Sequence, residues 1–297
     1  MTEKLDLPAY LESRKKIVDQ ALRDFLPSSD TWPTQLHQSM NYSIAAGGKR
    51  LRPILTIAAA EAVGRSYESV LAVACALELI HTYSLIHDDL PSMDDDDLRR
   101  GQPTNHKVYG EAMAILAGDS LLTEAFHLIA SSAKPEQAAT ALEVISRIAS
   151  ASGSRGMAGG QAVDLLSEKI KISLEELERL HRHKTGKLIQ VSIEAGALSA
   201  GADRRQLESL SRFGECIGLS FQIADDVLDI EGGEEIGKDV GSDIANNKAT
   251  YPALLGLEES KRLARDLTEE ALGLLRDFDA KADPLREIAR YVVYRKN

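Results

Sequence analysis

Residues 81–101 read HTYSLIHDDLPSMDDDDLRRG, and this stretch says most about the fold. Its first half has the apolar spacing of a helix, which runs directly into Asp88 and Asp89. Pro91 disfavours a helical conformation at the residue before it, so we expect the helix to end there and Asp94 to return in a folded-back loop. In an unbroken helix Asp88 and Asp94 would point about 120° apart. The break therefore lets both carboxylates face one metal ion, which would offset their repulsion.

Composition and periodicity predict an all-α protein. Only 5% of the 297 residues are aromatic, Ala, Leu, Glu and Arg are abundant, and alternating runs of Val, Ile and Thr are few. We find no convincing β-hairpin or βαβ unit. Helical periodicity covers residues 4–25, 33–46, 51–63, 67–90, 110–131, 135–150, 154–167, 174–200, 204–230, 251–278 and 284–294. No connecting segment reads as an interdomain linker, so residues 1–297 are predicted to form a single domain.

The overall charge and the N-terminus exclude several classes of protein. The chain has 35 Lys and Arg against 46 Asp and Glu, a net charge of −11, which argues against a general nucleic-acid binder. Two cysteines, Cys75 and Cys216, are too few for a secreted disulfide scaffold. The N-terminal MTEKLDLPAY lacks the apolar core of a signal peptide, and no stretch approaches about 18 uncharged apolar residues. We therefore expect a cytoplasmic protein without a membrane span.

A second acidic group lies in FQIADDVLDI, residues 221–230. Asp225 and Asp226 precede Asp229 by four and three residues, so the carboxylates occupy neighbouring positions on one helix, and Gln222 shares the face of Asp225. Their apolar neighbours favour burial and make a solvent surface a poor explanation. Hard oxygen ligands at the edge of a cavity suit Mg²⁺.

Cations accompany both acidic motifs. GGKRLRP, residues 47–53, places Lys49, Arg50 and Arg52 at a helix start, where backbone amides and the helix dipole favour an anion. This segment is not a Walker A loop, because GxxxxGK[ST] and a preceding strand are both absent. His81 precedes Asp88 by seven residues and shares its helix face. Further cations lie close to the acidic motifs in the sequence, namely Arg99, Arg100, Lys184, Lys238 and Lys248.

Carboxylate clusters and separate cationic patches on helices around an apolar interior describe a site for metal-bound diphosphates that carry a hydrocarbon. The chain resembles the short-chain trans-prenyl diphosphate synthases, or polyprenyl synthetases, and most closely the bacterial enzymes that make farnesyl diphosphate. The motifs that carry the resemblance occur in the family's order: GGKRLRP, HDDLPSMDDDDLRRGQPT, GGQAVDL, HKTGKL, FQIADDVLD and NNKATYPALLGLE. The resemblance implies the isoprenoid synthase fold, a bundle of about ten or more helices around a central hydrophobic cavity. It also implies a homodimer.

The resemblance assigns roles to individual residues. It implies that about three Mg²⁺ ions are bound per active site by carboxylates and diphosphate oxygens. The ligands would be Asp88 and Asp94, with Asp89 alongside. In the second motif the main ligand would be Asp225, with Asp226 and Asp229 close by or acting through water. The diphosphate of isopentenyl diphosphate would be held by Lys49, Arg52, His81 and Arg100. The allylic diphosphate would be held by Arg99, Lys184, Lys238 and Lys248. Thr185 and Gln222 would place oxygen dipoles beside the developing carbocation.

The implied reaction condenses isopentenyl diphosphate with dimethylallyl and then geranyl diphosphate to give (2E,6E)-farnesyl diphosphate. Metal ions and cations stabilise the departing diphosphate, the homoallylic double bond attacks the allylic cation, and a proton is lost. Tyr83 and Ser84 lie five and four residues before Asp88, and therefore about 6 to 7.5 Å below the metal site. The resemblance implies that a bulky ring there limits elongation, so we expect Tyr83 to stop growth at fifteen carbons.

Two long connections, residues 91–109 and 231–251, follow the acidic helix ends. Loops longer than about 12 to 15 residues in a compact domain are usually functional. Closure of the segment 231–251 would exclude water that otherwise quenches the cation.

Other assignments explain fewer residues. Within enzymes, the alternative is a geranylgeranyl or geranyl diphosphate synthase. A terpene cyclase normally has a different second motif and needs no second diphosphate site, and a regulatory subunit usually lacks one aspartate motif. A helical di-iron carboxylate protein is a remote alternative, because such sites use Glu-x-x-His pairs. The chain contains Glu78/His81, Glu124/His127 and Glu178/His181. That alternative leaves GGKRLRP and both aspartate motifs unexplained.

Overall fold

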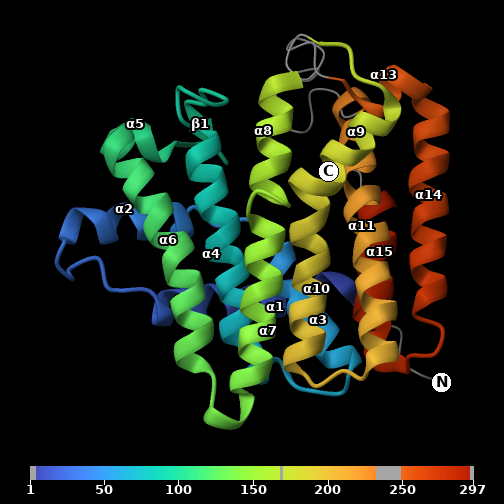
Figure 1. The fold of residues 1–297 in the computed structure, drawn as a ribbon, viewed down its shortest axis with the longest axis horizontal. Coiled ribbons are helices and arrows are strands. Elements are labelled where there is room, and N and C mark those ends of the chain that lie inside the picture. The colour runs from blue at the N-terminus through green and yellow to red at the C-terminus, as the bar shows by residue number, and fades with distance from the viewer. Residues whose placement is uncertain (1–4, 168–169, 232–248, 295–297) are drawn as a thin grey trace.

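The computed structural model describes residues 5–167, 170–231 and 249–294 (Figure 1). Within these residues the protein is built from helices, which confirms the predicted all-α class. The α-helices are α1 (Leu7–Phe25), α2 (Thr34–Ala45), α3 (Leu51–Ala62), α4 (Leu71–Asp88), α5 (Asn105–Tyr109), α6 (Glu111–Ser132), α7 (Ala138–Ser152), α8 (Met157–Ser167), α9 (Leu174–His181), α10 (Lys187–Ser199), α11 (Arg204–Glu231), α13 (Tyr251–Leu255), α14 (Leu257–Leu274) and α15 (Asp283–Tyr294). Short 3₁₀ turns are η1 (Tyr67–Ser69), η2 (Pro135–Gln137) and η5 (Ala280–Ala282), and η3 (Arg182–Gly186) is a π-helix.

The predicted helical ranges agree with these elements except at one break, at several ends and at α5, which lies in the predicted connection 91–109 and was missed. The range 251–278 is divided, because Gly256 has a φ of 84° and ends α13 before α14 begins. This left-handed conformation favours glycine, which has no Cβ. The helix α14 also ends at Leu274, four residues earlier than predicted.

The connection between α4 and α6 contains a small hairpin that the sequence analysis missed. Strand β1 (Leu98–Arg99) pairs antiparallel with β2 (Gln102–Pro103). The two residues between them, Arg100 and Gly101, have φ values of 56° and 76°. Two positive φ values are characteristic of a type I′ turn, whose twist matches that of the flanking strands. The expectation of no hairpin was therefore wrong, because RRGQ lacks the Asn-Gly or Asp-Gly signal of this turn.

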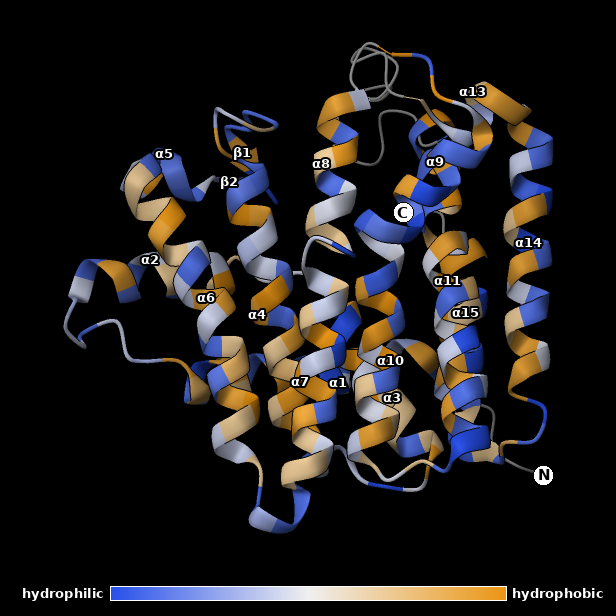
Figure 2. Cartoon of the chain, viewed as in Figure 1, coloured by the Kyte–Doolittle hydropathy of each residue, from blue (hydrophilic) through white to orange (hydrophobic). Residues whose placement is uncertain are grey.

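Two large groups of buried apolar side chains hold the bundle together. One surrounds α4, α6 and α7 and includes Ile80, Leu121 and Ile148. The other joins α3, α10, α11 and α15 and includes Leu55 and Phe213. Hydrophobic residues recur along α4, α6, α7 and α10, which lie side by side in the bundle (Figure 2). The arrangement leaves the carboxyl end of α4 opposite the π-helix and α8, where the site forms. That the chain forms one domain stays a prediction.

The helix α6 is unusually apolar. Among the described helices it alone is long and apolar enough to span a membrane by those two measures. Such a result is weak evidence, because the core helix of a soluble protein passes the same test. In the bundle α6 packs closely against α4 and α2, while Ile115 and Leu116 remain exposed.

Candidate active site

The chain folds back on itself at the end of α4, as predicted. The Asp94 N–H donates to the Asp88 carbonyl oxygen at 2.9 Å, so the two residues lie next to each other. The Asp95 N–H donates in the same way to the Leu90 carbonyl oxygen at 3.1 Å. The helix break predicted from Pro91 is therefore confirmed.

The two aspartates at the end of α4 have different surroundings. Burial raises the pKa of the Asp88 carboxyl to about 6, with Lys184 opposing this effect and Asp94 adding to it. Asp89 is buried and paired with Arg99, whose Nε and Nη2 lie 2.6 and 2.5 Å from Asp89 Oδ1. Asp88 is thus the carboxylate that lines the cavity described below, whereas Asp89 fixes the position of Arg99.

Lys184 and Thr185 lie on the π-helix η3, between α9 and α10. A π-turn widens the helix locally and is frequent at functional sites. The turn packs closely on α8, since a Cβ added to Gly160 would come within 2.3 Å of the Lys184 backbone nitrogen. The Lys184 Nζ lies 2.5 Å from Asp164 Oδ2 on α8. Burial lowers the pKa of Lys184, but attraction to Asp164 outweighs it, so the pKa is raised and the amine stays charged.

The second aspartate motif on α11 is connected to the π-helix by hydrogen bonds. The Thr185 hydroxyl donates to Gln222 Oε1 at 3.1 Å, and Gln222 Nε2 donates to Asp226 Oδ1 at 3.1 Å. The other Asp226 oxygen accepts the Tyr251 N–H at 3.0 Å. Thr185 and Gln222 are therefore in direct contact. Asp225 and Asp229 are half-buried on the same helix.

Arg50, one of the three cations of GGKRLRP, is a structural residue. Its side chain is 2% exposed, and its Nε and Nη1 lie 2.7 Å from Asp19 Oδ1 and Glu78 Oε1. Its Nη2 donates to the Ile44 carbonyl oxygen at 2.7 Å. Arg50 thereby joins α1, α2 and α4, and these partners account for its donors. The sequence alone had grouped it with the anion-binding cations.

Arg52 and Arg100 form a second group with the neutral imidazole of His81. Burial lowers the pKa of Arg52 to about 10, and burial together with Arg52 and Arg100 lowers the pKa of His81 well below its usual value. The buried Arg52 Nε and His81 Nδ1 have no hydrogen-bond partner in the described protein. Such groups need a partner, and an anion would supply one to the arginine. Arg100 reaches the group over Gly48, where a Cβ would lie 2.6 Å from the Arg100 guanidinium carbon. Lys49 is exposed at the edge.

These groups border one cavity of about 370 Å³. Its lining includes Arg52 from α3, His81 and Asp88 from α4, and Lys184 and Thr185 from the π-helix η3. The remaining lining is mostly apolar and includes Tyr83, Ser84, Leu85, Met93, Met157, Ala158, Ala162 and Leu165. A smaller hollow of about 140 Å³ adjoins it at Lys184 and also touches Asp164, Gln222 and Asp226. The structure thus joins charged groups at the end of α4 to an apolar pocket that Tyr83 lines.

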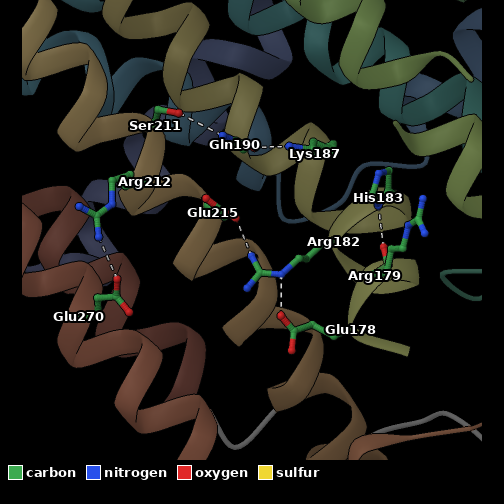
Figure 3. Close-up of polar contacts among 10 residues, drawn as sticks. All are labelled: Glu178, Arg179, Arg182, His183, Lys187, Gln190, Ser211, Arg212, Glu215 and Glu270. Carbon is green, nitrogen blue, oxygen red and sulfur yellow. Dashed lines mark hydrogen bonds and ion pairs between the residues drawn. The ribbon is translucent and has the colours of Figure 1, made fainter. Parts of the chain in front are cut away.

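The Glu-x-x-His pairs do not form a di-iron site in the described residues. Glu78 is bound to Arg50. Figure 3 shows Arg182 between Glu178 and Glu215, at 2.8 and 2.7 Å from their oxygens. The acids of two pairs are therefore occupied by arginines, which removes support for that alternative.

Some site residues were missed, and others lie outside the described residues. Asp164 and Gln161, both in GGQAVDL, line the site, although the motif was recognised without giving either a role. Asp164 is the only acid of that motif, which was the available signal.

A separate group of possible metal ligands lies in the loop after α4, where ligand atoms of Asp95, Asp97 and His106 lie within 4.8 Å of one another. Lys238 and Lys248, together with most of the predicted loop 231–251, lie outside the described residues.

Comparison with known proteins identifies the family of the chain. The sequence model of a family described as Polyprenyl synthetase matches residues 33–291. Farnesyl diphosphate synthase of Geobacillus stearothermophilus is 51% identical over 98% of this chain and 98% of its own length. The chloroplastic geranylgeranyl pyrophosphate synthase of Catharanthus roseus is 46% identical over 98% of this chain and 82% of its own. The crystal structure of an FPP/GFPP synthase from Zymomonas mobilis has a TM-score of 0.87 at 39% identity, covering 97% of this chain and 99% of that one. The resemblance seen in the motifs is confirmed, and the chain belongs to the polyprenyl synthetase family.

Proposed function

We propose that the protein is a prenyltransferase that condenses isopentenyl diphosphate with dimethylallyl and then geranyl diphosphate and releases (2E,6E)-farnesyl diphosphate. The observation that carries this function is the cavity that joins Asp88, Lys184, Arg52 and His81 to the ring of Tyr83. Charged groups at one end suit diphosphates, and an apolar pocket suits a hydrocarbon tail. The farnesyl diphosphate synthase at 51% identity supports the same product.

The donor set at the end of α4 fits Mg²⁺. Asp88 and Asp94 offer hard carboxylate oxygens on adjacent chain segments, and the buried Asp88 carboxyl has a pKa raised to about 6. A carboxylate in such surroundings keeps its charge best beside a cation. Asp225 and Asp229 supply the same ligand type from α11. Asp89 positions Arg99, and Asp226 positions Gln222. When bound, Mg²⁺ acts as a Lewis acid on the diphosphate oxygens.

The protein's own residues divide the remaining work. The diphosphate of isopentenyl diphosphate is held by Arg52 and His81, with Lys49 and Arg100. The allylic diphosphate is held by Arg99 and Lys184, together with Lys238 and Lys248. Because the Thr185 hydroxyl hydrogen points to Gln222 Oε1, the lone pairs of Thr185 Oγ1 are available to the allylic cation. These dipoles are fixed before the reaction, which is where electrostatic stabilisation is most effective. The departing diphosphate accepts the final proton.

Tyr83 limits chain length, and Ser84 lies beside it in the cavity wall. Tyr83 lies more than one helical turn before Asp88, on the wall of the apolar pocket that receives the tail. The alternative of a geranylgeranyl diphosphate synthase has its own support, since such an enzyme is 46% identical over nearly the whole chain. The length of the product therefore decides between them.

The protein acts in the cytoplasm as a homodimer. The exposed apolar strip of α6 supports the dimer, since Ile115 is 43% and Leu116 is 51% exposed. Light scattering after gel filtration tests this, and Leu116→Asp should shift the mass toward the monomer. Leu254→Asp, at a leucine on α13 that is 42% exposed, is the control. A wild-type mass of one chain would exclude the dimer.

The central experiment supplies Mg²⁺, isopentenyl diphosphate and one of three primers, dimethylallyl, geranyl or farnesyl diphosphate, and identifies the products. Farnesyl diphosphate from the first two primers, without extension of the third, is expected. Extension of farnesyl diphosphate would favour the geranylgeranyl alternative, and no product from any primer would contradict the function. EDTA should abolish turnover. Asp88→Asn should lower it strongly, whereas Asp277→Asn, at an exposed aspartate after α14, should not.

A further inference from the structure

We propose that His87 is a positioning residue for product length, because it fixes the ring of Tyr83 against α6 at a slot that Gly118 leaves open. The inference rests on the proposed function, in which Tyr83 limits elongation. Neither His87 nor Gly118 was singled out in the sequence, and both lie between the cavity and the exposed strip of α6.

The first contact joins two rings on α4. The rings of Tyr83 and His87 have centroids 5.7 Å apart and planes at 76°, an edge-to-face pair. Four residues separate them, so they lie on one face of the helix. Both rings line the cavity. An edge-to-face pair restricts the orientation of each ring more than aliphatic contact does.

The second contact anchors His87 to α6. Its Nε2 lies 3.2 Å from the carbonyl oxygen of Ile115. Since a carbonyl oxygen can only accept, Nε2 carries the hydrogen and donates it. The Asp119 Oδ1 lies 3.9 Å from the same nitrogen. The Nε2 side of the imidazole is therefore held by α6, while the same ring makes the edge-to-face contact with Tyr83.

The third feature is the space that receives the imidazole. A Cβ on Gly118 would lie 2.2 Å from His87 Nε2 and 2.6 Å from Cδ2, distances that real side chains do not tolerate. Gly118 lies within α6 and has an ordinary helical backbone, so its role here is to leave room rather than to supply flexibility. Any side chain at Gly118 must displace the imidazole and with it the support of the tyrosine.

The consequence concerns the wall that an elongating tail meets. With the imidazole in its slot, the Tyr83 ring cannot swing toward α6. Without it, the ring gains that freedom, and a tail longer than fifteen carbons fits for part of the time. The length of the product thus depends on a residue of α6 that does not line the described cavity.

The test measures the ratio of products longer than fifteen carbons to farnesyl diphosphate, from isopentenyl and geranyl diphosphates at matched conversion. This ratio does not depend on total activity. His87→Ala and Gly118→Ala should each raise it by about two- to tenfold, the range that an edge-to-face contact supports. His87→Phe keeps a ring beside Tyr83 and should stay nearer the wild-type ratio. Gly273→Ala is the matched control, because no atom lies within 4 Å of the Cβ it would add in α14.

Combination with Tyr83→Ala separates the inference from the function on which it rests. Tyr83→Ala alone should lengthen the products, and adding Gly118→Ala should then change the ratio no further. An unchanged ratio in both His87→Ala and Gly118→Ala, while Tyr83→Ala lengthens the products, would overturn the inference and leave the function intact. An equal effect of Gly118→Ala with and without Tyr83 would also overturn it. Unchanged products in Tyr83→Ala would instead refute the limit that the tyrosine sets.

Discussion

Replacing Arg50 by methionine should destabilise the protein without acting on the site directly. The Arg50 and Glu78 side chains are each 2% exposed and meet at 2.7 Å. Removing one partner of a buried pair leaves the other charge buried without its hydrogen-bonded counter-charge, which costs about 3 to 5 kcal/mol. Asp19, the second partner, keeps 25% of its side chain exposed and so loses little. The loss should therefore come mainly from Glu78.

The double variant Arg50→Met/Glu78→Leu tests this cause. Replacing both members of a buried pair with apolar side chains of similar volume is often neutral, since no buried charge remains. The double variant should therefore recover most of the loss. Arg52→Met, two residues further along the chain in the first turn of α3, is the matched comparison. Its pKa is lowered by burial, so removing the charge should not lower stability, whereas it should impair use of isopentenyl diphosphate.

Urea unfolding measures the stability lost in Arg50→Met and the stability recovered in the double variant. With an m-value of about 3 kcal/mol per molar, the Arg50→Met loss corresponds to a midpoint lower by about 1 to 1.7 M. An unchanged m-value would show that stability, not the unfolded state, has changed. A shift below about 0.3 M, or a double variant as unstable as Arg50→Met, would refute the reasoning.

Asp164→Asn should lower turnover about ten- to a hundredfold, because the ion pair at 2.5 Å positions Lys184. Steady-state kinetics with geranyl diphosphate would check this, and near wild-type rates would contradict it. Tyr83→Ala should yield longer products and Ser84→Phe shorter ones, as measured by chromatography; unchanged profiles in both would exclude the limit at this depth. Burial lowers the pKa of His181 to about 4. Below about pH 6.5 the unfolded chain therefore takes up a proton that the folded protein does not. The free energy of unfolding should fall by up to about 3 kcal/mol between pH 6.5 and 4. Comparison of urea midpoints with those of His181→Gln would isolate this contribution, and parallel curves for the two proteins would exclude it.

Local rules account for the parts of the fold that were predicted. Pro91 acts on its own neighbours, so the break after Asp88 follows from the sequence. The hairpin was missed because its turn depends on tertiary contacts as well as on local preference. Arg100 adopts a φ of 56°, which is uncommon for a residue with a Cβ, and its guanidinium rests against Gly48, which is distant in the sequence.

The pairing of charges could not be predicted from the sequence. The site was recognised because acids and bases cluster in motifs, but a motif does not say which base meets which acid. Arg50 finds Asp19 and Glu78, 31 and 28 residues away, and Lys184 finds Asp164, 20 residues away. Such partners are set by helix packing, which brings together residues that local periodicity treats separately.

The same argument separates the aspartates within each motif. Asp89 is engaged with Arg99, and Asp226 accepts from Gln222 and Tyr251, so both carboxylates fix protein groups in place. Asp88 faces the cavity, with a pKa raised by burial. A row of identical acids thus contains two kinds of residue, and the difference lies in their partners rather than in their spacing. Loss of Asp89 would act through a displaced Arg99, whereas loss of Asp88 would remove a carboxylate from the cavity itself. Two adjacent aspartates would therefore contribute to the proposed reaction by different physical routes.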